Sequence, residues 1–118
     1  MRVAAFVATL LLLVAFAGEA SAHASLVFAD PRDGTVLTQA PKTVQLRFNE
    51  SVTAGAVNLI DASGKSRTDT VIDASDEAIN VALPADLPKG TQIVSYRVIS
   101  ADGHPVAGSI TLDRKSVV

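Results

Sequence analysis

Two histidines carry most of the chemistry that this sequence offers. His23 follows an apolar N-terminal stretch, and His104 lies in the segment Asp102-Gly103-His104-Pro105. An aspartate and a histidine two positions apart point the same way in an extended chain, and carboxylate with imidazole is a good pair of metal ligands. The segment is also ordinary turn chemistry, so a solvated turn histidine is the alternative reading.

His23 gains a second nitrogen ligand if the chain is cut in front of it. A basic residue, the apolar run Val3–Ala17 and the small-x-small sequence Ala20-Ser21-Ala22 follow the order of a secretory signal peptide. The run is shorter than the about 20 residues that a membrane span needs, so cleavage is favoured over anchoring. We therefore expect a cleaved signal peptide at residues 1–22 and one periplasmic domain at residues 23–118, which does not itself span a membrane.

A histidine at a new N-terminus can chelate a metal ion through its imidazole and its α-amino nitrogen. The amine has a pKa of about 7.7–8.0 in peptides, so it gives up its proton readily to a metal. With Asp102 and His104 it would complete a set of three nitrogens and one oxygen. Such donors in a tetragonal arrangement suit Cu(II), with Ni(II) second. We expect one Cu(II) site formed by His23, Asp102 and His104; the alternative is that cleavage leaves a histidine there by chance.

Glu50 is a further candidate for this site. It follows a predicted strand and could face the same end of the fold, as an outer group or an axial ligand, or it is simply solvated. The chain has no cysteine, and its one methionine, Met1, belongs to the predicted signal peptide. The predicted domain therefore has no sulfur ligand.

The rest of the composition excludes several classes of function. The net charge is −2, with few aromatic residues and no basic stripe, which argues against nucleic-acid binding. The sequence contains no G-x-S-x-G motif, no phosphate-binding glycine loop and no visible nucleophile–base pair. We therefore expect a binding protein and no enzyme.

The elements that must position these residues are strands, because apolar residues alternate with polar ones along most of the chain. Val44, Leu46 and Phe48 alternate with Gln45 and Arg47, as in a half-buried strand. About seven such segments, separated by turns rich in Pro, Gly and Asp, predict an all-β sandwich or small barrel. The predicted strands lie near residues 26–28, 44–48, 57–59, 68–72, 79–83, 91–100 and 110–112.

The sequence resembles the CopC family of periplasmic copper-binding proteins. The resemblance covers essentially all of residues 23–118. It rests on four groups of segments: His23-Ala24; Asp30-Pro31 with Asp33-Gly34; Leu46-Arg47-Phe48-Asn49-Glu50-Ser51-Val52; and Gly90, Tyr96, Val98 and Ser100 to Gly108. It implies a Greek-key β-sandwich of immunoglobulin- or cupredoxin-like shape, with Cu(II) bound by His23 through amine and imidazole, by Asp102 and by His104. Glu50 matches a family glutamate near that site.

The resemblance also bears on oxidation state and partners. Some members hold Cu(I) in a methionine-rich loop, which this chain lacks, so a Cu(II)-only protein is implied. A membrane transporter of the CopD type would be a separate chain. The leading interpretation is a protein that sequesters or carries Cu(II) for copper tolerance or homeostasis.

Two other functions compete with this interpretation. A copper-dependent oxidative enzyme with a histidine-brace site would be larger and have an aromatic substrate face, whereas this chain has one tyrosine and no tryptophan. A metal-free immunoglobulin-like interaction module would need neither His23 nor His104.

Overall fold

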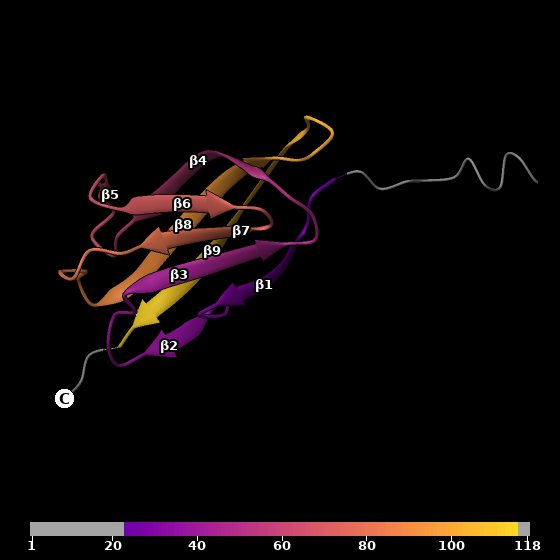
Figure 1. Ribbon diagram of the computed structural model, residues 1–118. Coiled ribbons are helices and arrows are strands. Elements are labelled where there is room, and N and C mark those ends of the chain that lie inside the picture. The colour runs from indigo at the N-terminus through magenta and orange to yellow at the C-terminus, as the bar shows by residue number, and fades with distance from the viewer. Residues whose placement is uncertain (1–22, 116–118) are drawn as a thin grey trace, which may run out of the picture.

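The computed structural model describes residues 23–115, so the predicted signal peptide at residues 1–22 lies outside the described residues. Two β-sheets pack face to face (Figure 1). The four-stranded sheet has the order β1-β3-β7-β6, and the five-stranded sheet has the order β2-β9-β8-β4-β5. Neighbouring strands are antiparallel except for β2 and β9. The strands are β1 (Leu26–Asp30), β2 (Thr35–Leu37), β3 (Thr43–Phe48), β4 (Thr53–Ile60), β5 (Ser66–Arg67), β6 (Val71–Ser75), β7 (Ala78–Ala82), β8 (Gly90–Ile99) and β9 (Pro105–Arg114). Within the described part of the chain, no helix is long and apolar enough to cross a membrane.

The core lies between the two sheets and follows from the alternation in the sequence. In β3, Val44, Leu46 and Phe48 are buried, whereas Arg47 points outward and is exposed. The rings of Phe48 and Tyr96 meet edge to face across the core, with their centroids 5.5 Å apart, a favourable aromatic geometry. The other buried apolar residues are Ala24, Leu59, Ile79, Val81, Leu87, Val94, Val98, Ile110 and Leu112.

The predicted all-β sandwich is confirmed, and residues 23–115 form nine strands in place of about seven. The two unpredicted strands, β2 and β5, have three and two residues, which is too short to show a period. The strand predicted near residues 68–72 was misplaced: β6 begins only at Val71 and extends to Ser75. Residues 68–70 instead carry the chain from β5 in one sheet to β6 in the other.

The directions of the strands bring three distant segments to one end of the sandwich (Figure 1). These segments are residues 23–25 before β1, residues 49–52 between β3 and β4, and the β8–β9 loop at residues 100–104. We call this the hairpin end. The connection that contains β5 and the connection between β7 and β8 lie at the opposite end.

Candidate metal centre

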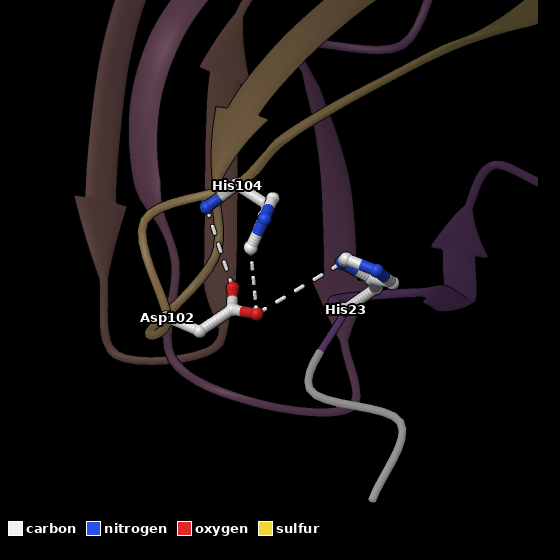
Figure 2. A group of neighbouring side chains, drawn as sticks. All are labelled: His23, Asp102 and His104. Atoms are coloured by element: carbon white, nitrogen blue, oxygen red, sulfur yellow. Dashed lines mark hydrogen bonds and ion pairs between the residues drawn. The ribbon is translucent and has the colours of Figure 1, made fainter. Parts of the chain in front are cut away.

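Three side chains from two of these segments converge at the hairpin end (Figure 2). His23, Asp102 and His104 each contribute one potential ligand atom, and these atoms lie within 4.8 Å of one another. Asp102 Oδ2 is 2.8 Å from His104 Nδ1 and 4.0 Å from His23 Nδ1. Among residues 23–115, no other group of three such side chains comes this close. The fold thus brings together the three residues that the sequence singles out.

The β8–β9 loop is shaped by its own hydrogen bonds. The Ser100 amide donates to the His104 carbonyl oxygen at 2.9 Å, and the Gly103 amide donates to the Ser100 carbonyl oxygen at 2.9 Å. Gly103 has a φ of 87°, in the left-handed region that glycine adopts without steric cost. This tight turn places Asp102 and His104 on the same side of the loop.

One oxygen of Asp102 is held by the loop, which leaves the other to face the imidazoles. The buried Ser100 hydroxyl donates to Asp102 Oδ1, and the His104 amide donates to the same oxygen at 3.3 Å. The Ser100 hydroxyl, followed by the bonds from His104, lowers the pKa of Asp102 to about 2. Asp102 is therefore a charged carboxylate at neutral pH, and Oδ2 is the oxygen directed at both histidines.

The segment that carries His23 is anchored by the two residues that follow it. Ala24 is buried in the core, and Ser25 exchanges two hydrogen bonds with Asn49. The Ser25 amide donates to Asn49 Oδ1 at 2.8 Å, and the Asn49 amide donates to the Ser25 carbonyl oxygen at 3.0 Å. The His23 and His104 rings lie edge to face with centroids 4.9 Å apart, and each side chain is 61% exposed.

Glu50 lies at the hairpin end but does not join this group of three. Its carboxylate accepts a hydrogen bond from the Ala101 amide at 3.2 Å.

The sequence alone assigned no role to Asn49 or to the Ser100 hydroxyl. The backbone partner of Asn49 is 24 positions away, so no local pattern could have revealed it. The only signal was its place beside Glu50, directly after a strand.

The exposed donors define what this site can bind. Two imidazole nitrogens and one carboxylate oxygen, without sulfur, suit a divalent transition-metal ion. A metal ion on His104 Nδ1 would take the place of the hydrogen bond to Asp102 Oδ2, and the neutral imidazole would then carry its proton on Nε2.

Comparisons with known proteins agree on one family. Residues 26–114 match the CopC domain. The chain is 32% identical over 106 residues to Copper resistance protein C of Pseudomonas syringae pv. tomato, and the match covers 81% of this chain and 83% of that protein. It is 34% identical over 108 residues to Copper transport protein CutJ of Bacillus subtilis, a match that covers 86% of this chain. That match spans only 20% of the Bacillus protein.

Solved structures show the same fold. The chain is similar to the crystal structure of CopC from Methylosinus trichosporium OB3b, with a TM-score of 0.68 and 26% identity over 81% of this chain and 100% of that chain. It is also similar to PcoC, a methionine-rich copper resistance protein from Escherichia coli, with a TM-score of 0.64 and 27% identity over 78% of this chain and 98% of that chain. The family resemblance noted in the sequence is thereby confirmed, and the chain belongs to the CopC family.

Proposed function

We propose that this protein binds one Cu(II) ion in the periplasm through His23, Asp102 and His104, and that it sequesters or carries copper for copper tolerance or homeostasis. The observation that carries this proposal is the convergence of three ligand atoms, from segments far apart in the chain, within 4.8 Å of one another. The names of the relatives, which refer to copper resistance and copper transport, support copper as the metal.

The separations between the ligand atoms allow the three side chains to share one ion. Ligand atoms about 2.0 Å from a metal lie about 2.8 Å apart when they are at right angles and about 4.0 Å apart when they are opposite. Asp102 Oδ2 is 2.8 Å from His104 Nδ1 and 4.0 Å from His23 Nδ1. Asp102 Oδ2 thus lies within reach of both imidazoles, and an ion bound by all three side chains would draw ligand atoms that span up to 4.8 Å closer together.

The fourth ligand in this proposal is the α-amino nitrogen of His23, freed when residues 1–22 are removed. Together with Nδ1 of the same residue it closes a six-membered chelate ring on the ion. An amide nitrogen at that position is a much poorer ligand. Copper binding then depends on export and cleavage, in keeping with a protein that acts in the periplasm.

The ligand set supports Cu(II) in preference to Cu(I). Soft thiolate and thioether ligands select Cu(I), and the chain has no cysteine and no methionine after Met1. The similar protein PcoC, in contrast, is described as methionine rich. We expect ascorbate to release copper from the protein to a Cu(I) chelator, and we expect no release when ascorbate is omitted.

Binding, and not catalysis, is the role that this site supports. With copper bound, Asp102 would fill a coordination position that oxygen needs in a copper oxygenase. Both imidazoles are largely exposed, so a partner could approach the ion directly. A membrane transporter of the CopD type is the partner that the family resemblance implies, and the similarity to a protein named for copper transport agrees with a role in copper transfer.

The proposal is tested by titrating Cu(II) into three purified proteins. One begins at His23, the second has one glycine before His23, and the third is His104→Ala. We expect tight binding of one tetragonal Cu(II) by the first protein, seen by competition and by EPR, and much weaker binding by the other two. Equal and weak binding by all three would contradict the proposal and favour a metal-free interaction module.

A further inference from the structure

Two consecutive residues at the end of β3 hold the two segments that carry the proposed ligands. Asn49 pairs with Ser25 through two hydrogen bonds, of 2.8 Å and 3.0 Å. Glu50 accepts the amide proton of Ala101 at 3.2 Å, across 51 positions in the chain. Asn49 thus fixes the backbone two residues after His23, and Glu50 fixes the backbone one residue before Asp102.

The contacts of Asn49 and Glu50 fix a distance that the hydrogen bonds within the β8–β9 loop leave open. The bonds within residues 100–104 set the shape of the loop and the placement of Asp102 beside His104. They do not set the distance from this loop to His23. Asn49 and Glu50 are covalent neighbours, so the two segments are held at a separation of one peptide unit plus two short hydrogen-bonded arms.

We infer that Asn49 and Glu50 form a positioning pair that sets the spacing between His23 and the Asp102–His104 loop before the metal arrives, with Glu50 acting as a hydrogen-bond acceptor and not as a metal ligand. This inference rests on the proposed Cu(II) site. Its physical basis is preorganisation: a site whose ligands are already spaced for the ion loses less conformational freedom when the ion binds. Groups that orient metal ligands typically contribute 10- to 100-fold to affinity.

Glu50 could act as a hydrogen-bond acceptor or as a metal ligand, and these two roles require different chemical groups. Glu50 lies outside the group of three ligand side chains, and its carboxylate accepts a hydrogen bond from a backbone amide. A hydrogen-bond acceptor needs an oxygen at that position but no charge. A weak ligand to Cu(II) would need the charged carboxylate, and its loss would change the electronic structure of the ion.

The test uses the protein that begins at His23, with Cu(II) affinity measured by competition and the ion characterised by EPR. We expect Glu50→Ala and Asn49→Ala each to weaken binding about 10-fold, while the EPR parameters at saturating copper remain those of the wild type. Glu50→Gln and Asn49→Asp keep the acceptor oxygen, and we expect both to bind within about threefold of the wild type. Glu77→Ala removes an exposed carboxylate from the turn between β6 and β7 and serves as the matched control.

A metal-free measurement separates positioning from ligation. The edge-to-face contact between the rings of His23 and His104 should give NOEs in the apo-protein. We expect these NOEs to weaken in Asn49→Ala and Glu50→Ala and to persist in Glu50→Gln, in samples whose thermal unfolding shows that they are folded. If Glu50→Gln weakens Cu(II) binding and shifts the EPR spectrum, Glu50 is a ligand and the inference is wrong.

Two further results separate this inference from the proposed function. If both alanine variants keep wild-type affinity and NOEs, the positioning pair is overturned while the Cu(II) site stands. If the wild-type protein does not bind Cu(II), the proposed function fails; the NOEs alone then decide whether the pair positions the two histidines.

Discussion

Both ends of the sandwich gather carboxylates, and each end surrounds them with different partners. At the hairpin end, Asp102 faces two histidine side chains that are each 61% exposed. At the opposite end, Arg67 has a side chain only 9% exposed. Its guanidinium lies 3.5 Å from Asp61, 2.6 Å from Asp69 and 2.5 Å from Asp86.

The difference separates a structural cluster from a site for an exchangeable ion. The guanidinium belongs to the chain and is a cation at neutral pH. The hydrogen bonds that it donates to Asp69 and Asp86 raise the pKa of Arg67 further. It has donors only, so this cluster is complete without a ligand. The imidazoles of the hairpin end offer lone pairs instead, and they remain open to solvent. The same kind of residue, aspartate, therefore serves architecture at one end and, in the proposed site, metal binding at the other.

Loss of a proposed ligand at the hairpin end should have the greatest effect on Cu(II) binding. We expect His104→Ala to lower Cu(II) affinity by more than about 100-fold, beyond the range for residues that only orient ligands. Because this side chain is exposed, the apo-protein should melt within about 2 °C of the wild type. Competition titration and thermal unfolding measure the two quantities. Wild-type affinity in His104→Ala would place the metal elsewhere.

The matching change at the opposite end should act on stability alone. Arg67→Ala leaves the carboxylates of Asp61, Asp69 and Asp86 without their cation, and we expect Tm to fall by at least about 5 °C. Cu(II) affinity at a temperature where the protein is folded should not change. Asp86→Ala removes a largely exposed partner and is the control, with a much smaller effect. A wild-type Tm for Arg67→Ala would show that the cluster is not structural.

An intermediate effect is expected at Gly108, the last residue of the motif that contains Asp102 and His104. A Cβ atom here would overlap the hydroxyl and ring of Tyr96, which lies directly against this glycine. We expect Gly108→Ala to lower the free energy of unfolding by about 1–3 kcal/mol, measured by urea denaturation, with Cu(II) affinity unchanged. Ser109→Ala, at an exposed neighbour, should stay within about 0.5 kcal/mol of the wild type. An unchanged Gly108→Ala protein would refute the steric role.

The smallest effect concerns acid stability at the opposite end. The Ser63 hydroxyl and the amides of Lys65 and Ser63 lower the pKa of Asp61 below its usual value. A lowered pKa contributes stability above the unfolded value of about 3.9 and loses it as the pH falls towards the folded value. We expect Tm to decline between about pH 5 and pH 2, and less steeply in Asp61→Asn. An equally steep decline in Asp61→Asn would contradict this assignment.

The sequence allowed the strands and the three proposed ligands to be predicted for different reasons. The strands follow from local alternation, as in Val44, Leu46 and Phe48. The ligands follow from unusual chemical positions: His23 after a cleavage motif, and His104 two residues from Asp102. Their meeting in space was required by this interpretation, and the fold supplies it.

The supporting contacts could not be predicted in this way, because each joins segments that no local pattern relates. Asn49 pairs with a backbone 24 positions away, and Glu50 with one 51 positions away. Arg67 is similar, since one of its partners, Asp86, is 19 positions distant. Contacts of this kind depend on the order and direction of the strands in the two sheets. The periodicity of hydrophobic residues indicates where strands lie along the chain but not which strands are neighbours.

In the proposed site, one Cu(II) ion is shared by His23 and His104 at the hairpin end. Pulsed EPR on the copper-loaded protein that begins at His23 tests it most directly, because the remote nitrogen of each bound imidazole modulates the echo. With two coordinated imidazoles, replacing either histidine with alanine should remove half of the imidazole modulation while the protein stays folded. A spectrum of a single imidazole in the wild type, unchanged in His104→Ala, would contradict the claim.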